Sequence, residues 1–250
     1  MAGAALRRRL TWSIADVVGV VVENPTVRSI VLEVPAWPGH LPGQHLDLRL
    51  TAEDGYQAQR SYSIATPANG ESVTITVEMV DDGEVSPYLT EELRTGDRIE
   101  VRGPIGGYFV WDTSSTRPLF LVGGGSGVVP LMSMVRAWSE VGSAVPVRYL
   151  ASARTFDRLI YFQELEVLAA ADRELRLTHT LTRSHPDDWT GPTRRIDSEM
   201  LSGSGFDPSD SPEIFVCGPT GFVESVAQTL VTDGHRPEDI KTERFGPSGG

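Results

Sequence analysis

A run of glycines directly after an apolar stretch constrains the fold of this chain more than any other feature of its sequence. Residues 118–122 are mostly apolar, residues 123–127 read Gly-Gly-Gly-Ser-Gly, and a helical pattern follows over residues 129–140. Glycines let the backbone turn sharply and lie close to a ligand, and a helix N-terminus presents free N–H groups to a pyrophosphate. A glycine-rich turn that serves packing alone is the alternative. The pattern favours a phosphate site formed by Gly124, Gly125, Ser126 and Gly127.

This loop departs from the dinucleotide fingerprint G-x-G-x-x-G, because Pro130 stands where the third glycine is expected. The next predicted strand, residues 145–151, is followed by Ser152, Ala153 and Arg154. No Asp or Glu is present there to bind a ribose 2′-hydroxyl. An ordinary NAD-dependent dehydrogenase is therefore not the best fit.

Residues 12–110 have the pattern of antiparallel β-structure. Short β-branched runs alternate with turn signals, and a serine followed by a proline opens one predicted helix over residues 86–93. Six short strands at this spacing indicate a small barrel or sandwich. The predicted strands cover residues 17–22, 27–34, 45–50, 59–64, 73–80 and 98–102.

Residues 118–245 alternate strands with helices, which indicates a parallel sheet with helices on both faces. Beyond the glycine loop we predict strands at 145–151, 175–181 and 213–216, and helices at 159–170 and 222–233. A polar segment that ends in proline, residues 112–118, separates the two halves. The chain is therefore predicted to form two domains, residues 1–113 and residues 118–250.

Composition excludes several classes of protein. The formal net charge of −12 argues against non-specific nucleic-acid binding, and suits either simple solubility or docking to a basic partner. The one cysteine, Cys217, allows no intramolecular disulfide and no cysteine cluster for zinc or iron–sulfur, so no metal site is predicted. No run approaches ~20 apolar residues and no signal peptide is recognised, so we expect no membrane insertion and a cytoplasmic location.

Six segments of the chain resemble motifs of the ferredoxin–NADP reductase superfamily and occur in that family's order. The segments are Arg60-Ser61-Tyr62-Ser63, Gly83-Glu84-Val85-Ser86, Gly103-Pro104-Ile105-Gly106-Gly107-Tyr108-Phe109, the loop from Gly123 to Pro130, Cys217-Gly218-Pro219 and Glu243-Arg244-Phe245. The resemblance covers about residues 12–246. It implies an antiparallel β-barrel FAD-binding domain followed by an α/β parallel-sheet nucleotide-binding domain.

The resemblance implies FAD rather than FMN, because two separate phosphate-contacting segments suit a pyrophosphate. Arg60 would supply a planar fork for phosphate oxygens, Tyr62 would flank the flavin, and Ser63 would hydrogen-bond flavin N5, the atom that receives hydride. Judged alone, Arg60 could equally form a surface salt bridge, and Tyr62 and Ser63 could serve strand packing. The predicted flavin-binding residues are Arg60, Ser61, Tyr62, Ser63, Val77, Gly83, Val85, Ser86 and Phe245.

The resemblance also implies roles at the end of the chain. Cys217, with Gly218 and Pro219, would lie near the reacting nicotinamide at the carboxyl edge of the sheet; a small buried hydrophobe is the alternative for a lone cysteine. Phe245 falls where the family has an aromatic residue that stacks on the flavin, although residues 246–250 follow it here. Glu243 would serve a proton relay or a salt bridge, or be an ordinary solvated glutamate. The predicted catalytic residues are Ser63, Cys217, Glu243 and Phe245.

NADPH is favoured over NADH as the hydride donor, because the 2′-phosphate needs a cationic clamp. Arg154 and Arg183 follow two predicted strands at the edge where the adenosine ribose would lie, and Arg194 and Arg195 come soon after. The alternative is that these arginines are solvated loop residues.

The implied activity is an FAD-dependent NAD(P)H reductase. The sequence has no iron–sulfur ligand set and no room for a fused haem domain, so we expect electrons to leave through a separate acceptor protein such as a ferredoxin, an oxygenase or another redox enzyme. One alternative is a reductase of free flavin, quinone or ferric chelates. Another is a non-catalytic electron-transfer or binding subunit, against which the intact motifs at Arg60–Ser63 and Gly83–Ser86 argue.

Overall fold

The first half of the chain folds into an antiparallel β-domain in the computed structural model, which describes residues 10–52 and 54–245. The strands occur where short β-branched runs alternate with turns, as the sequence predicts. They are β1 Ser13–Asn24, β2 Val27–Glu33, β3 His45–Thr51, β4 Gln57–Ser63, β5 Ser72–Glu78 and β6 Arg98–Ile105.

These strands form a closed barrel. Their order is β4-β3-β6-β1-β2-β5. The two edge strands meet where Ile64, directly after β4, forms an antiparallel bridge to Ile75 of β5. The Ala65 N–H also donates to the carbonyl of Thr74, at 2.7 Å. Closure covers the strand edges and encloses a core of alternating apolar residues, so the barrel is confirmed over the sandwich.

The predicted helix between β5 and β6 is confirmed. It begins at Ser86 and Pro87 and continues through the wide helical turn Tyr88–Glu92. Proline suits this position because the first helical N–H groups have no partner within the helix. Leu89 and Leu93 pack into the barrel core and hold the segment against one end of the barrel.

The second half forms a parallel sheet in the order β11-β10-β7-β8-β9, covered by helices. The strands are β7 Leu119–Gly124, β8 Val147–Ala153, β9 Leu175–Leu181, β10 Glu213–Pro219 and β11 Ile240–Phe245. The helices are α1 Val128–Glu140, α2 Phe162–Ala171, α3 Ser198–Ser204 and α4 Thr220–Thr232.

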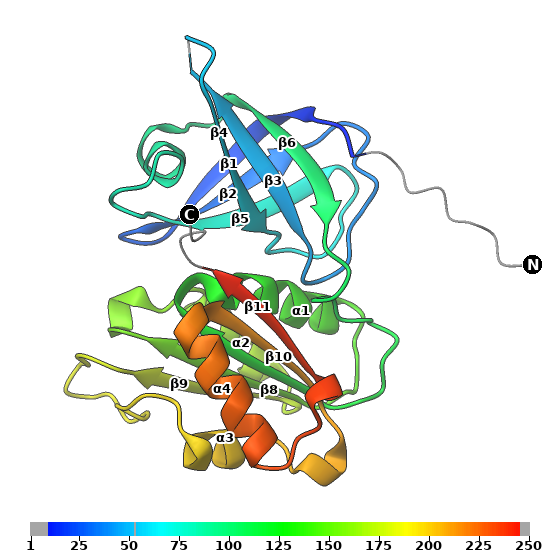
Figure 1. Ribbon diagram of the computed structural model, residues 1–250, viewed down its shortest axis with the longest axis vertical. Helices are drawn as coiled ribbons and strands as arrows, with labels where there is room; N and C mark the ends of the chain where they lie inside the picture. The colour runs from blue at the N-terminus through cyan, green and yellow to red at the C-terminus, as the bar shows by residue number, and fades with distance from the viewer. Residues whose placement is uncertain (1–9, 53, 246–250) are drawn as a thin grey trace, which may run out of the picture.

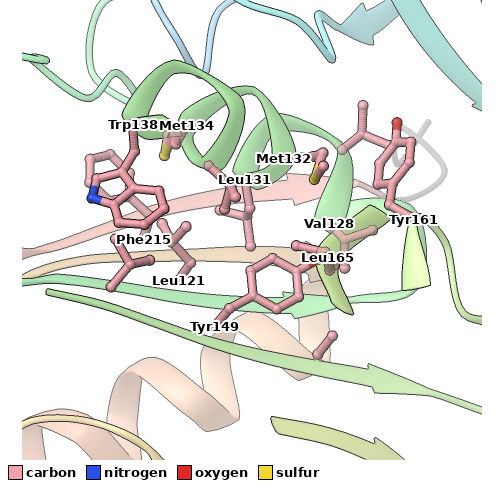
Figure 2. Packing of buried hydrophobic residues seen from close by; sticks show 14 of the residues in the cluster. Leu121, Val128, Leu131, Met132, Met134, Trp138, Tyr149, Tyr161, Leu165 and Phe215 are labelled. Carbon is pink, nitrogen blue, oxygen red and sulfur yellow. The ribbon is translucent and has the colours of Figure 1, made fainter. Parts of the chain in front are cut away.

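Helices cover both faces of this sheet, as the strand–helix alternation predicts. On one face α1 and α2 bury a cluster that includes Leu131, Trp138, Tyr149 and Phe215 (Figure 2). On the other face α3 and α4 pack on residues such as Phe120. Because both faces of β7 are covered, its four apolar residues at 119–122 are all buried, which explains their continuous apolar run.

The structure also corrects several predicted elements of this half: β10 ends at Pro219 rather than at residue 216, and α4 begins at Thr220 rather than at residue 222. Strand β11 and helix α3 were not predicted, because both are short and carry many polar residues. Strand β8 begins at Val147 rather than at residue 145, since Pro146 has no N–H to pair. Helix α2 begins at Phe162 rather than at residue 159, because Tyr161 adopts a left-handed backbone conformation and helical geometry starts only after it.

The barrel and the α/β domain lie directly against each other, with α1 and the end of β11 on the side of the barrel (Figure 1). The Gly43 N–H donates to Ser133 Oγ of α1 at 2.9 Å. The Lys241 ammonium of β11 donates to the carbonyl of Val110 at 2.9 Å. Among the described residues, no helix is long and apolar enough to cross a membrane.

Candidate functional site

The end of strand β4 carries four of the predicted flavin-binding residues. The side chain of Arg60 is 55% exposed, and Ser61 donates to Asp47 at 2.7 Å. Tyr62 is half-buried against the barrel core, and this burial raises the pKa of its phenol. Ser63 is 4% exposed, and its Oγ is buried without a hydrogen-bond partner in the described part of the chain. Buried polar atoms are rarely left unpaired, so the Ser63 hydroxyl is a candidate ligand contact.

The second predicted flavin segment lies beside the first in space. The Arg60 Nη2 atom is 3.9 Å from Glu84 Oε2. Ser86 Oγ accepts from the Val80 N–H at 3.1 Å and closes a tight loop around Gly83. A methyl group on Gly83 would lie 2.9 Å from that same oxygen, so the loop needs glycine at this position.

Two further candidates do not present their side chains to a ligand. Val77 and Val85 are each 1% exposed and belong to the barrel core. Only their main-chain groups could contact a cofactor. A β-branched residue within a strand is a stronger signal for packing than for binding.

The glycine loop connects β7 to α1 and packs tightly on β10. Gly125 has a φ of +57°, which L-amino acids with a side chain rarely adopt. A methyl group on Gly127 would lie 2.2 Å from the carbonyl oxygen of Cys217 and 2.6 Å from the Cα of Gly218. The loop can therefore lie against the Cys217–Gly218 backbone only without a side chain at Gly127. Its position in front of α1 leaves the first N–H groups of the helix directed at this loop.

Cys217, Glu243 and Phe245 lie at the carboxyl ends of neighbouring strands. Cys217 of β10 pairs in register with Glu243 of β11 and with Gly123 of β7. Cys217 is fully buried, whereas Phe245 is half-buried and packs against the cluster under α1. Residues 246–250, which follow Phe245 and leave open whether it stacks on a flavin, lie outside the described residues.

His45 joins the two halves of the site and was missed by the sequence analysis. It pairs in register with Ser63 on the barrel, and its Nδ1 atom is 3.7 Å from Glu243 Oε1. The only feature of the sequence that could have indicated His45 is its position as a polar aromatic residue at the start of a strand. Its partner Glu243 lies far along the chain, so only the packing of the two domains reveals the pair.

Burial in this cluster disfavours the charged forms of Glu243, Cys217 and His45. Burial raises the pKa of Glu243 to about 7, so its carboxyl gains and loses a proton around neutral pH. Burial, together with the Glu243 carboxylate, raises the pKa of Cys217, which therefore stays a thiol. Burial lowers the pKa of His45, and the Asp47 carboxylate opposes that shift. The arrangement can hold or pass one proton beside a reacting group, and offers no thiolate nucleophile.

The arginines predicted to select NADPH gather at the carboxyl ends of β8 and β9. The Arg183 N–H donates to the Arg154 carbonyl at 2.9 Å. The Leu181 N–H donates to Pro192 at 3.0 Å, which brings the segment carrying Arg195 beside the end of β9. Arg154, Arg183 and Arg195 are all exposed.

The neighbouring Arg194 is engaged in ion pairs. Its guanidinium lies 2.7 Å from Asp197 and 2.9 Å from Glu199. Asp197 also caps α3 by accepting from the Met200 N–H. Arg194 therefore serves the start of α3, and Arg154, Arg183 and Arg195 are the better candidates for a phosphate.

The residues present fit an FAD in the barrel and a nicotinamide dinucleotide on the sheet. In the barrel, the Ser63 hydroxyl, which is unpaired within the described residues, supplies a hydrogen-bond donor, and the exposed Arg60 guanidinium supplies a cation. In the α/β domain, Gly125 and Gly127 leave the backbone bare at the start of α1, where phosphates bind. Arg154 and Thr155, which directly follow β8, include no acid that could bind a ribose 2′-hydroxyl.

Comparison with known proteins gives the same two units in the same order. Residues 21–110 match the oxidoreductase FAD-binding domain family, and residues 121–228 match the oxidoreductase NAD-binding domain family. A similar relative is the glycine betaine monooxygenase reductase subunit of Chromohalobacter salexigens, 35% identical over 208 residues that cover 82% of this chain and 56% of the relative. Another is the toluate 1,2-dioxygenase electron transfer component of Pseudomonas putida, 27% identical over 212 residues that cover 83% of this chain and 59% of the relative.

A similar solved structure is the flavohaem-like FAD/NAD-binding domain of nitric oxide dioxygenase from Vibrio cholerae O1 biovar El Tor. Its TM-score is 0.84 at 25% identity, and the match covers 94% of this chain and 99% of that one. The chain spans a little over half the length of the two curated relatives. With both domain families matched in order, on a barrel followed by a parallel sheet, the chain consists of an oxidoreductase FAD-binding domain followed by an oxidoreductase NAD-binding domain, and it shares the fold of a ferredoxin–NADP⁺ reductase from Neisseria gonorrhoeae, with a TM-score of 0.79 at 20% identity.

Proposed function

We propose that this protein takes hydride from NAD(P)H onto FAD and passes the electrons to a separate acceptor protein. The proposal rests on one observation: the candidate flavin-binding residues of the barrel lie next to the candidate nicotinamide-binding residues of the parallel sheet. Ser63, whose buried hydroxyl has no partner among the described residues, pairs across the strands with His45. His45 lies 3.7 Å from Glu243, which pairs in register with Cys217. A flavin on β4 and a nicotinamide at the end of β10 would share this one site.

Bound FAD would supply the atom that accepts hydride and would hold the electrons until an acceptor removes them. The residues of the chain itself would position the flavin and the nucleotide relative to each other. Arg60 would hold a phosphate, Tyr62 would flank the flavin, and the Ser63 hydroxyl would donate a hydrogen bond to it. Gly125 and Gly127 would hold the dinucleotide phosphates, and Cys217 would supply a small neutral surface beside the nicotinamide. No general acid is needed for the hydride step, so catalysis is mainly positioning.

The proposed acceptor is an oxygenase component, a ferredoxin or another redox enzyme. The two relatives are described as a reductase subunit and an electron transfer component, which supports an acceptor on another chain. We also infer that the flavin domain is residues 1–113, that the nucleotide domain is residues 118–250, and that the protein works in the cytoplasm. Limited proteolysis in the linker and cell fractionation would test these inferences.

The test of this function starts with the purified protein. Acid should release a yellow cofactor that runs as FAD on chromatography, and anaerobic NADPH should bleach its absorbance in a single turnover. Release of FMN, or of no flavin after incubation with excess FAD, would contradict the proposal. Fast reduction of free flavin or quinone with no protein acceptor found by pull-down would favour a small-molecule reductase.

Replacing Ser63 with alanine should slow flavin reduction by NADPH about tenfold, the scale of one lost hydrogen bond near the reacting atom. The dissociation constant for NADPH should change less than twofold. The apoprotein should keep or slightly gain thermal stability, because the hydroxyl has no partner in the described structure. Stopped-flow absorbance under anaerobic conditions measures the rate. An unchanged rate would remove Ser63 from the site.

NADPH should be used more efficiently than NADH, and Arg183→Ala should reduce that preference by ~1–3 kcal/mol while nearly preserving NADH use. The cause is the 2′-phosphate, which only NADPH carries and which needs a cationic partner. Arg173→Ala is the matched control, because this exposed arginine precedes β9 at the opposite end of the strand. Steady-state kcat/KM with both nucleotides is the measurement. Equal or better use of NADH by the wild type would refute the arginine argument.

A further inference from the structure

A chain of hydroxyl groups crosses the boundary between the two domains beside the start of α2. The Tyr161 hydroxyl donates to Thr76 Oγ1 at 2.5 Å, Thr76 Oγ1 lies 2.8 Å from Ser29 Oγ, and Ser29 donates to Glu23 Oε1 at 2.6 Å. Since the proton of Ser29 goes to Glu23, Thr76 must donate to Ser29. Thr76 and Ser29 therefore each donate once and accept once, Tyr161 donates at one end, and the chain ends on the Glu23 carboxylate.

These hydroxyls are buried where the two domains pack together. Tyr161 is 4% exposed, and Thr76 and Ser29 are each 5% exposed. Thr76 and Ser29 pair in register on the barrel, between residues such as Ile75 that face its interior. They lie on its outer face, which the α/β domain covers. Inside such a low-dielectric contact a satisfied chain is strengthened, and a broken one leaves buried polar atoms unpaired.

The backbone of Tyr161 is fitted to this contact. Its φ is +61°, a left-handed conformation that residues with a side chain rarely adopt and that persists where surrounding contacts hold it. Its carbonyl accepts from the Leu165 N–H, so the same residue is the N-cap of α2. Figure 2 shows the Tyr161 hydroxyl directed away from the parallel sheet.

A second side chain supports the same contact. The Arg136 guanidinium of α1 lies 4.9 Å from the centre of the Tyr161 ring. It donates to the Ala65 carbonyl of the barrel at 2.8 Å and pairs with Glu164 of α2 at 2.7 Å. The Tyr161 ring is thus fixed between a cation and the barrel, with few alternative orientations.

From this geometry we infer that Tyr161 is a positioning residue, which holds the α/β domain in one orientation against the barrel. This inference rests on the proposed function, because the orientation of the α/β domain sets the position of the nicotinamide site relative to Ser63. Small errors in that placement lower the rate of a transfer that depends on alignment. Tyr161 itself touches none of the reacting groups.

The first test is Tyr161→Phe, which keeps the ring and removes only the hydroxyl. Tyr149→Phe is the matched control, because Tyr149 lies in the same core cluster and its hydroxyl has no partner among the described residues. Single-turnover flavin reduction at saturating NADPH should fall about tenfold in Tyr161→Phe, with dissociation constants for FAD and NADPH changed less than twofold. Tyr149→Phe should react at the wild-type rate. An unchanged rate in Tyr161→Phe, or an equal fall in both variants, overturns the inference.

The second test needs no nucleotide and separates this inference from the proposed function. Thermal unfolding is measured for Tyr161→Phe, Thr76→Val and the double variant of the full chain. If the two hydroxyls act as one contact, the double variant is no less stable than the less stable single variant. Strictly additive losses overturn the contact. If neither NADPH nor NADH reduces the flavin of the wild-type protein, the proposed function is wrong. The positioning role of Tyr161 is then wrong too, whatever the unfolding measurements show.

Discussion

Replacing Gly127 with alanine should destabilise the nucleotide domain by about 3 kcal/mol and abolish measurable reduction by NADPH, while the barrel still binds FAD. The added methyl group would lie 2.2 Å from the carbonyl oxygen of Cys217 and 2.5 Å from its carbon. Both are backbone atoms of a central strand and cannot rotate away. The loop must separate from β10, and the phosphate site in front of α1 opens. Gly127 itself has an ordinary helical φ of −60°, so lack of space alone causes the effect.

Gly203→Ala is the matched control for this variant. Gly203 lies in α3, and a methyl group there meets no atom within 4 Å. The control should keep wild-type activity, and its stability should stay level or rise, since alanine is the better helix former. Urea unfolding, flavin content and NADPH-driven reduction give the three readouts. Full activity in Gly127→Ala would mean that the loop is not held against Cys217 as described.

Replacing Arg60 with alanine should weaken FAD binding by about 1.5–3 kcal/mol, which is roughly ten- to 150-fold in the dissociation constant. The reason is that a charge-assisted hydrogen bond to a phosphate would be lost. The unfolding free energy of the apoprotein should stay within about 0.5 kcal/mol of the wild type. The guanidinium is more than half exposed and its ion pair with Glu84 spans 3.9 Å, so it contributes little without the ligand.

Arg98→Ala provides the comparison for Arg60. Arg98 is also an exposed arginine on a barrel strand, but it lies on β6 opposite Asp16 of β1. Its loss changes the net charge by the same amount and should leave FAD affinity unchanged. Titration of apoprotein with FAD, followed by flavin fluorescence, measures both variants. Equal affinities for Arg60→Ala and the wild type would assign Arg60 to the surface salt bridge instead.

Predictions from the sequence were most accurate where local rules apply. Six short strands, the helix after Ser86 and the strand, turn and helix around Gly125 follow from residue spacing, and each is present. Strand β11 was missed because Ile240–Phe245 is polar and lies at the edge of the sheet, with no alternation to mark it. It becomes a strand by pairing with β10, which is a property of the sheet rather than of the segment.

The candidate site divides in the same way. Arg60, Ser63, Cys217 and Glu243 are candidates from the sequence alone, because each sits in a short motif whose residues are neighbours in the chain. It gave no reason to select His45, whose partner Glu243 comes from the other domain. It also could not show that the Val77 side chain is committed to the barrel core.

The sequence by itself determined the two folding units, the glycine loop and the identity of most candidate binding residues, since backbone freedom, helix starts and strand patterns are encoded within a few residues. Only the tertiary structure decided how the two units meet. The contacts of His45 with Glu243 and of Tyr161 with Thr76 join residues from different domains. Burial in that contact raises the pKa of Glu243 to about 7 and makes the hydroxyls of Thr76 and Ser29 inaccessible to water. Such effects depend on exclusion of solvent by distant segments, which no local pattern of residues records.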